Sequence, residues 1–438
     1  MTYPYFENGR LKAAQIIGNS SLGGVTQSIL NYYQHMDKSR WRFDFFTYES
    51  SPNPEETAVY KEYYPAMFRK KEADDLHEKA TPSEITLSDN MKKTEDSNSL
   101  LSLKERLKEI DPESRIFTIP RLDTQFYKAM PVLKRLLTQE NYAVAHSHMT
   151  VLSAFALPPA KKAGVPVRIC HTHSTFDKNS DHFLIKAALR PFAAKDANVL
   201  LACGKLAAQS LFRDRANEAI LLPNAVDLKK FKPLSAERRT ALREKLNLCG
   251  GTFLFVGRFA EQKNLPFLLR SFERLCAMIR SSERIPKNLN PILQNKMPTL
   301  VLVGDGIMRQ KLKRLAETLK IANQVRFVPP CDPLQWYQAA DVFVLPSLYE
   351  GLPVVAAEAQ ATDLPCLFSD RIDRNADICR FAEFLPLDAE LWAKRMFLPR
   401  ERRSGGIRKL REAGYDIRQQ AQKLQEIYDF ALSRTFNT

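Results

Sequence analysis

The stretch Ser347-Leu-Tyr-Glu-Gly-Leu-Pro-Val-Val-Ala-Ala-Glu358 is the most informative part of this chain, because it places two carboxylates around a strand-to-helix turn. The residues before it, Ala340-Asp-Val-Phe-Val-Leu-Pro346, are typical of a short buried strand. Pro353 suits the first turn of a helix, where its missing N–H costs nothing. We therefore expect Glu350 at the corner, beside helix N–H groups that stabilise negative charge, and Glu358 about two turns further along the helix.

Two carboxylates held at different depths suit the hydroxyl groups of a sugar or a ribose. The alternative is that Glu350 only stabilises the helix start and that Glu358 is a solvated helix residue. The surroundings of Glu358 argue against this alternative, because it lies among valine and alanine residues rather than on a charged face. An acid in such surroundings usually has a specific partner.

The same residues carry a resemblance to a known family. Leu345-Pro-Ser-Leu-Tyr-Glu-Gly-Leu-Pro353, followed by Glu358-Ala-Gln and Leu364-Pro-Cys, resembles the E-x7-E signature of retaining glycosyltransferases with the GT-B fold, of the family 4 type. Within that family the chain is most similar to bacterial capsule and exopolysaccharide enzymes. The resemblance implies an α/β fold of two doubly wound Rossmann-like domains that face an interdomain cleft, with a C-terminal helix that returns to the first domain.

Composition agrees with a large globular chain. Its 438 residues, 44% of them hydrophobic, exceed one ordinary core and indicate two domains of about 200 residues each. No apolar run is long enough to span a bilayer, and the first residues lack the pattern of a signal peptide. Seven scattered cysteines without C-x-x-C pairs argue against a zinc site or a disulfide framework. These features predict a protein of the reducing cytoplasm.

The formal net charge of +15 has three candidate partners: nucleic acid, an anionic membrane surface and polyanionic nucleotide-sugars. Nucleic acid ranks lowest, because no helix-turn-helix, RNP or zinc-finger pattern accompanies the basic residues. The charge could also serve solubility alone. We expect a nucleotide-sugar, a glycan or lipid-linked sugar acceptor, and a peripheral contact with the anionic inner face of the cell membrane.

Strands and helices alternate in both halves of the chain, as in two doubly wound sheets. Strands are expected at 12–17, 43–47, 143–146, 167–170, 198–202, 219–222, 252–256, 299–304, 325–328 and 342–345. The domains are then residues 1–222 and 223–414, and residues 415–438 form an amphipathic helix that packs back on the first domain. Charged stretches at about 53–98 and at 281–296 are expected to be insertions.

Glycine-containing turns that follow the expected strands offer backbone N–H groups to a phosphate. Each could be an ordinary tight turn on its own. The resemblance assigns them to the donor, with the residues Gly23, Gly24, Gly257 and Gly304. It also places Phe327 beside the nucleobase. Pro330 stands where the family often has a glycine, which leaves the choice of base open.

The segment Val256-Gly-Arg-Phe-Ala-Glu-Gln-Lys-Asn264 brings Arg258 and Lys263 onto one loop after a strand. Two fixed cations suit a leaving nucleoside diphosphate, whose negative charge grows as the sugar bond breaks. Alternatively, both only solvate the loop. The resemblance assigns both to the diphosphate, in place of the divalent metal that other transferases need. Asn264 replaces the family's usual glycine and can still adopt a left-handed turn.

Histidines occur in two pairs, His146-Ser-His148 and His171-Thr-His173, each directly after an expected strand. Single histidines are usually structural, and a metal site lacks an Asp or Cys ligand at suitable spacing. The resemblance implies a histidine that contacts the sugar or the phosphate, at His171 or at His173. We take His173 as the candidate, because it precedes the Ser174-Thr175 loop.

The resemblance therefore implies a metal-independent, retaining hexosyltransferase that takes a sugar from a nucleoside diphosphate, with a UDP-sugar as the expected donor and co-substrate and with no other cofactor. The expected catalytic residues are Glu350, His173, Arg258 and Lys263, and the donor is also contacted by Gly351, Leu352 and Glu358. A UDP-sugar epimerase of the same fold and a non-catalytic membrane-associated scaffold are the alternatives. A dinucleotide oxidoreductase lacks its G-x-G-x-x-G pattern here.

A membrane contact is expected at Phe183-Leu-Ile-Lys-Ala-Ala-Leu-Arg-Pro-Phe192. Lys186 and Arg190 are four residues apart and share one helical face beside an apolar surface. Such a segment suits anionic headgroups, although a buried helix with two solvated cations fits the same pattern.

Overall fold

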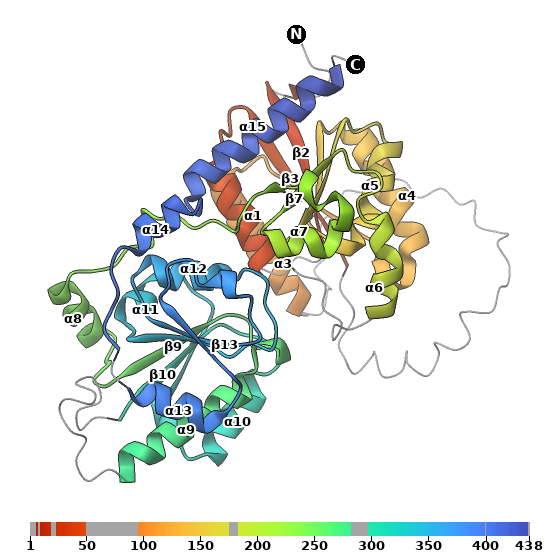
Figure 1. Cartoon of the computed structure of the whole chain (residues 1–438). Coiled ribbons are helices and arrows are strands. Elements are labelled where there is room, and N and C mark those ends of the chain that lie inside the picture. The colour runs from red at the N-terminus through yellow and green to blue at the C-terminus, as the bar shows by residue number, and fades with distance from the viewer. Residues whose placement is uncertain are drawn as a thin grey trace, which may run out of the picture.

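Figure 1 shows the computed structural model, in which two lobes, each a parallel sheet with helices, are joined by two crossover segments. The structure describes residues 6–7, 9–18, 23–49, 95–174, 183–281, 297–398 and 400–436. The insertion expected at about 53–98 lies outside the described residues up to residue 94, and the one expected at 281–296 lies outside them from residue 282 onward.

The first lobe is built on a sheet with the strand order β4-β3-β2-β5-β6-β7-β8, to which β1 adds an antiparallel pair with β2. The other neighbouring strands pair in parallel. The strands are β1 (Phe6–Glu7), β2 (Arg10–Ile17), β3 (Trp41–Tyr48), β4 (Ile116–Ile119), β5 (Val144–Ser147), β6 (Val167–Thr172), β7 (Val199–Ala202) and β8 (Ile220–Leu221). The order reverses between β2 and β5, so the crevice of this sheet opens at their carboxyl ends.

The second lobe is built on a parallel sheet with the order β11-β10-β9-β12-β13-β14. Its strands are β9 (Thr252–Val256), β10 (Thr299–Val303), β11 (Val325–Val328), β12 (Val342–Leu345), β13 (Cys366–Ser369) and β14 (Ala382–Leu385). Here the order reverses between β9 and β12. The two strands that precede the predicted Arg258 loop and the predicted Glu350 turn are therefore neighbours, and their carboxyl ends form the crevice of this sheet.

Helices link the strands, because parallel neighbours need a crossover connection. In the first lobe they are α1 (Gly24–His35), α3 (Glu95–Ile110), α4 (Leu122–Glu140), α5 (Ser153–Lys162), α6 (Phe183–Leu189) and α7 (Lys205–Phe212). In the second lobe they are α8 (Ala236–Lys245), α9 (Leu265–Ser281), α10 (Arg309–Thr318), α11 (Leu334–Ala339), α12 (Val354–Ala361), α13 (Ala389–Phe397) and α14 (Gly406–Glu412). No helix within the described ranges is long and apolar enough to cross a membrane.

The last helix, α15 (Ile417–Phe436), packs on the first lobe, where it runs alongside α1 in Figure 1. One face of it is buried in the core of that lobe, through Ile417, Ala421, Leu424, Tyr428 and Leu432. The Tyr428 ring meets Trp41 edge-on, with ring centroids 5.0 Å apart. The amphipathic pattern of the sequence thus predicted the helix, and the family resemblance predicted the lobe that it covers.

The two crossover segments lie side by side. Val226, on the outgoing segment, forms a parallel bridge with Asp416 on the returning one. Its N–H donates to the Tyr415 carbonyl at 2.9 Å, and its carbonyl accepts from the Ile417 N–H at 3.1 Å. Ala225 belongs to the core of the first lobe and Val226 to the core of the second, so the outgoing chain changes lobes between these two residues.

Candidate functional site

The Glu350 carboxylate lies just beyond the end of β12 and is held by side chains of two loops. Ser347 Oγ donates to Glu350 Oε1 at 2.7 Å, and Lys263 Nζ forms an ion pair with the same oxygen. Gln262 Nε2 lies 3.4 Å from Glu350 Oε2 and donates to the Tyr349 carbonyl at 2.8 Å. Only 9% of the Glu350 side chain is exposed, so protein groups compensate much of its charge.

Arg258 and Lys263 lie on one loop after β9, as the sequence predicted, but their surroundings differ. Lys263 is turned toward Glu350, a partner that the sequence did not predict. Arg258 is exposed, and none of the described residues pairs with its guanidinium. Asn264 adopts the predicted left-handed turn, with φ of 51°. The loop therefore presents one paired and one unpaired cation, and the unpaired one is available to an anion.

The glycines after β9 and β10 allow two loops to touch backbone to backbone. Gly257 and Gly304 have φ of 151° and 144°, which side chains rarely adopt. A Cβ on Gly304 would lie 2.0 Å from the Gly257 carbonyl oxygen, and one on Gly306 would lie 2.6 Å from that of Phe259. The Phe259 N–H donates to the Asp305 carbonyl at 2.7 Å. These glycines hold the loop of Arg258 against the neighbouring strand end.

Gly23 and Gly24 mark the start of α1 in the first lobe. Gly23 is the N-cap, and no side chain caps the helix. Gly24 is exposed, and a Cβ placed on it would meet nothing within 4 Å. Packing therefore does not require a glycine at position 24, whereas the uncapped N–H groups leave this helix end able to receive an anion.

Glu358 is buried on α12, with 8% of its surface exposed. Tyr337 Oη donates to its Oε2 at 3.0 Å, which supplies the specific partner expected from its apolar surroundings. Burial raises the pKa of the Glu358 carboxyl to about 7, although the Tyr337 hydrogen bond and the nearby Lys230 act in the opposite direction. Pro353 is the N-cap of α12, one residue before the predicted first turn. Glu358 is thus poised between its charged and neutral forms at pH 7.

The turn after Glu350 touches the first lobe. A Cβ on Gly351 would lie 3.0 Å from the His173 carbonyl oxygen, and Asn224 Nδ2 donates to the Leu352 carbonyl at 3.1 Å. The Leu352 side chain packs so closely on Gly204 that a Cβ there would lie 2.8 Å from its Cδ1. The structure therefore brings His173 and the Glu350 turn together across the two lobes. Sequence reasoning missed Asn224, although it lies next to the expected boundary between residues 222 and 223.

Four buried histidines stand side by side at the ends of β5 and β6. His148 Nδ1 lies 2.9 Å from His173 Nε2, and His146 Nε2 lies 3.1 Å from His171 Nδ1. The rings of His146 and His148 stack with centroids 4.0 Å apart, and so do those of His171 and His173. Burial lowers the pKa of all four imidazoles, that of His173 to about 4. Burial therefore favours the neutral form of these imidazoles.

Three of these histidines, His146, His148 and His171, bring ring nitrogens within 4.8 Å of one another. Two nitrogens bound to one tetrahedral zinc ion would be roughly 3.3 Å apart. Within this trio, the facing nitrogens of His146 and His171 lie 3.1 Å apart, at hydrogen-bond distance, and His148 Nδ1 faces His173 at 2.9 Å instead of the other two. In addition, the nitrogen lone pairs of rings that lie over one another point in similar directions, so they do not converge on one position that a metal ion could occupy. The array is therefore a hydrogen-bonded network.

Of the two histidines left open by the sequence, His173 is the one beside the Glu350 turn. It follows β6, whereas His171 lies inside that strand and its Nε2 has no partner among the described residues. Phe327 lies on β11 at the edge of the second sheet, with its ring edge-on to Phe259. Gly23, Gly257, Gly304 and Phe327 are thus all at strand ends or helix starts on the crevice side.

Comparisons with known proteins agree with this architecture. Residues 97–230 match the model of the family described as Glycosyltransferase Family 4, and residues 239–385 match that of Glycosyl transferases group 1. The putative glycosyltransferase EpsF of Bacillus subtilis is 28% identical over 97% of this chain and 98% of that protein. The UDP-Gal:alpha-D-GlcNAc-diphosphoundecaprenol alpha-1,3-galactosyltransferase of Escherichia coli is 31% identical over 60% of this chain and 67% of that protein.

Solved structures share the fold. Anabaena HepE in complex with UDP and glucose superposes with a TM-score of 0.61, at 14% identity over 97% of each chain. Sucrose-phosphate synthase of Thermosynechococcus elongatus superposes with a TM-score of 0.64, at 17% identity over 97% of this chain and all of that one. At such low identity these likenesses concern the arrangement of the two lobes and not their ligands.

Proposed function

Since this chain belongs to the glycosyltransferases of the family 4 type, with the GT-B fold, we propose that it is a retaining enzyme that uses a UDP-sugar. The acceptor is a glycan or a lipid-linked sugar in the synthesis of a surface polysaccharide. The E. coli relative is named for a UDP-galactose donor and a diphosphoundecaprenol-linked acceptor, and the HepE structure holds UDP and glucose. These names support the choice of donor and of acceptor class.

The observation that carries this proposal is the Lys263–Glu350 pair, because Lys263 shares its loop with the exposed Arg258 and Glu350 adjoins Gly351, which lies against the His173 carbonyl. We assign Arg258 and Lys263 to the diphosphate, where they stabilise the charge that develops as the sugar bond breaks. Glu350 accepts hydrogen bonds from the transferred sugar, and Glu358 accepts them from the ribose. Each anion of the donor then meets a cation that is already in place.

We also propose that the reaction needs no divalent metal and no cofactor beyond the UDP-sugar. The guanidinium of Arg258 and the ammonium group of Lys263 can neutralise the negative charge of the leaving diphosphate, which is what a metal ion does in other transferases. The uncapped start of α1 at Gly23 and Gly24 adds backbone N–H groups to the same task.

Incubation with a panel of labelled UDP-sugars and polyprenyl-diphosphate sugars tests the proposal. We expect UDP release together with a labelled, lengthened acceptor, unchanged by EDTA, and a product whose anomeric configuration equals that of the donor by NMR. Free altered sugar would identify an epimerase of the same fold. Absence of turnover with every nucleotide-sugar would leave the scaffold alternative.

The proposed membrane contact rests on exposed apolar side chains around α6. Leu184 and Ile185 are 79% and 59% exposed, and Phe126 on α4 is 51% exposed. Arg190 donates to carbonyls of α7, so Lys186 is left as the cation of this segment that can serve headgroups. We expect sedimentation with anionic liposomes at low salt, reduced by Leu184→Asp with Ile185→Asp. Equal sedimentation with neutral vesicles would refute the contact.

A further inference from the structure

A chain of hydrogen bonds leads from the Glu350 turn into the first lobe. Asn224 Nδ2 donates to the Leu352 carbonyl at 3.1 Å, which fixes the orientation of the Asn224 amide, because a carbonyl can only accept. Asn224 Oδ1 therefore faces His173 Nδ1, at 3.2 Å, and this nitrogen must carry a proton. The other nitrogen, His173 Nε2, faces His148 Nδ1 at 2.9 Å.

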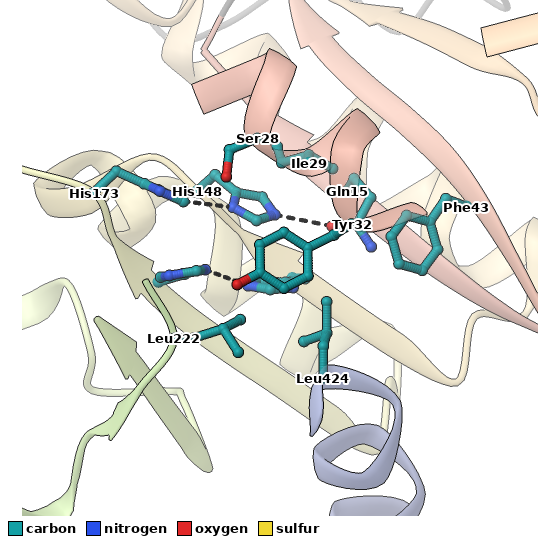
Figure 2. Close-up of a pocket in the computed structure, with 11 residues that line it drawn as sticks. Gln15, Ser28, Ile29, Tyr32, Phe43, His148, His173, Leu222 and Leu424 are labelled. Atoms are coloured by element: carbon teal, nitrogen blue, oxygen red, sulfur yellow. Dashed lines mark hydrogen bonds between the residues drawn. The ribbon is translucent and has the colours of Figure 1, made fainter. Parts of the chain in front are cut away.

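The chain continues past His148 to the last helix. His148 Nε2 lies 2.9 Å from Gln15 Oε1, and Gln15 Nε2 donates to Tyr428 Oη at 3.2 Å. In Figure 2, His148 lies between His173 and Gln15, and dashed lines mark both of its hydrogen bonds. An amide oxygen only accepts, so in this arrangement His148 Nε2 must also carry a proton.

The protons of the His148–His173 pair can now be counted. His173 Nδ1 needs one for Asn224, His148 Nε2 needs one for Gln15, and a third must lie between the two rings at 2.9 Å. Two neutral imidazoles have two ring protons between them. The arrangement therefore corresponds to a pair that shares one positive charge, which belongs to the pair and not to one ring.

Burial opposes this charge in the unliganded protein. It lowers the pKa of His173 to about 4 and that of His148 well below its ordinary value. The neutral pair is satisfied when the Gln15 amide turns over, so that its Nε2 donates to His148, because the Tyr428 hydroxyl can then donate to Gln15. When the Tyr428 hydroxyl donates to Gln15, His146 Nδ1 must donate to that hydroxyl. His171 Nδ1 must then donate to His146 Nε2. The network thus has two complete states, which differ by one proton, by the orientation of the Gln15 amide and by the tautomers of His146 and His171.

The surroundings of the pair contain no anion of their own. Among the described residues that line this pocket, the other polar groups are Ser28 and Tyr32 on α1, His146, and His171. Tyr428 on α15 and Asn224 on the crossover segment complete the contacts. None is a carboxylate. A stable positive charge therefore needs an anion from outside. The Glu350 turn contacts the backbone carbonyl of His173, so the histidine pair lies next to that turn.

We propose that the His148–His173 pair takes up one proton when the anionic donor binds, and that His148 and Gln15 are the positioning residues that decide the charge of His173. This inference rests on the proposed function, since the donor diphosphate supplies the anion. In the free protein the pair is neutral, which suits a buried site that offers it no opposite charge. In the complex it is an imidazolium pair beside the Glu350 turn, and its attraction to the diphosphate adds to that of Arg258 and Lys263.

The chain offers a matched control in the second pair, His146 and His171. Its rings are also buried and its facing nitrogens lie 3.1 Å apart. It ends on one side at Tyr428, which it shares with Gln15, and on the other at His171 Nε2, which has no partner among the described residues. Two neutral rings satisfy it without an additional proton. A change at His146 should therefore leave the proton count of donor binding unchanged.

Calorimetry of UDP-sugar binding at pH 7, in buffers of different ionisation enthalpy, measures the number of protons taken up. His148→Asn places an amide that can still donate to His173 Nε2, so that His173 stays neutral and in position. We expect wild type and His146→Asn to take up about one proton more than His148→Asn. Any proton exchange at Glu358 cancels in this difference. Equal uptake by wild type and His148→Asn would overturn the proposal.

A second measurement separates this inference from the proposed function. If no UDP-sugar binds, the proposed donor is wrong, and the pair is tested with inorganic diphosphate by 15N-histidine NMR, which reports the protonation of each ring nitrogen. An imidazolium signature that appears in wild type and not in His148→Asn supports the proton-accepting pair. Neutral signatures that persist in wild type with diphosphate bound overturn it.

Discussion

The two lobes bury titratable side chains at strand ends that face each other, but of opposite kinds. The first lobe buries four imidazoles, whose charged form is positive, and the second buries Glu350 and Glu358, whose charged form is negative. Burial drives both sides toward the neutral form: it lowers the pKa of His173 to about 4 and raises that of Glu358 to about 7. Burial therefore favours neutral histidines and a neutral Glu358 in the empty site, whereas the proposed contacts with a nucleotide-sugar use their charged forms.

If the proposed donor binds here, we expect it to draw a proton into the first lobe and to release one from the second. The exception is Glu350, which has an ammonium partner in Lys263 and a hydroxyl partner in Ser347, whereas Glu358 has a hydroxyl partner in Tyr337. Glu350 is thus held by an ion pair, and Glu358 by a hydroxyl group. The following experiments act on one lobe or on one of these groups at a time, in order of decreasing expected effect.

Removing a cation of the second lobe should have the largest effect. Arg258→Ala and Lys263→Ala should each lower kcat by about 10²–10³-fold and change KM less, because the diphosphate charge develops in the transition state. Steady-state kinetics with a UDP-sugar measures this. Arg274→Ala, which removes an exposed arginine 3.8 Å from Glu390, is the control and should leave kcat unchanged. Activity that survives both changes but is lost in EDTA would establish a metal-dependent reaction.

Removing the buried carboxylate of the second lobe should weaken binding rather than turnover. Glu358→Ala deletes a charge-assisted hydrogen bond to the ribose, worth about 1.5–3 kcal/mol, so UDP affinity should fall about ten- to a hundredfold. Calorimetry with UDP measures this, and circular dichroism checks that the fold persists. Unchanged affinity in a folded variant would exclude the ribose contact.

The titrating groups of the two lobes should change the UDP-sugar affinity in opposite directions as the pH falls. Glu358 has a raised pKa of about 7, so it gains a proton as pH falls below 7, and its contribution should decline by up to about tenfold per pH unit. The histidine pair gains its proton in the same direction, and its contribution should rise. In Glu358→Gln the loss of affinity toward acid should disappear, while the opposite slope remains. If the UDP-sugar affinity of Glu358→Gln does not change between pH 5.5 and 8.5, the histidine pair does not titrate on donor binding. Glu358 would then account for the whole pH dependence of the wild type.

The smallest effect is expected where the first lobe meets its last helix. Tyr428→Phe removes the hydroxyl that lies 2.7 Å from His146 Nδ1 and 3.2 Å from Gln15 Nε2. The free energy of unfolding should fall by about 1 kcal/mol, as measured by urea denaturation. Tyr127→Phe, on a side chain that is 59% exposed, is the control. If both variants unfold alike, the network does not contribute measurably to stability.

The sequence predicted well what depends on local pattern. Apolar runs located β2, β9 and β12, and the short apolar segment after Pro353 located α12, because burial imposes a periodicity that is visible in the residues themselves. Four short strands were not predicted: the two-residue β1, and β4, β13 and β14. Each of the last three has four residues, and β4 and β14 are edge strands, where half-exposed positions remove the pattern.

The contacts between residues at neighbouring strand ends could not be predicted from the sequence. Lys263 and Glu350 are 87 positions apart, and their ion pair depends on β9 and β12 being neighbours in the sheet. Gln15 and His148 are 133 positions apart and meet because β2 pairs with β5. The sequence showed two pairs of histidines at strand ends, but which nitrogen faces which follows from the register of β5 and β6.

The return of α15 to the first lobe also has a consequence for biosynthesis. The lobe that leaves the ribosome first obtains its last core helix from residues 417–436, after the whole second lobe has been translated. Until then the surface that later receives Tyr428, including Trp41 and Phe43, is uncovered. Domains usually complete their folding in the order of synthesis. In this chain the second lobe can close its core first, and the first lobe waits until α15 has been synthesised.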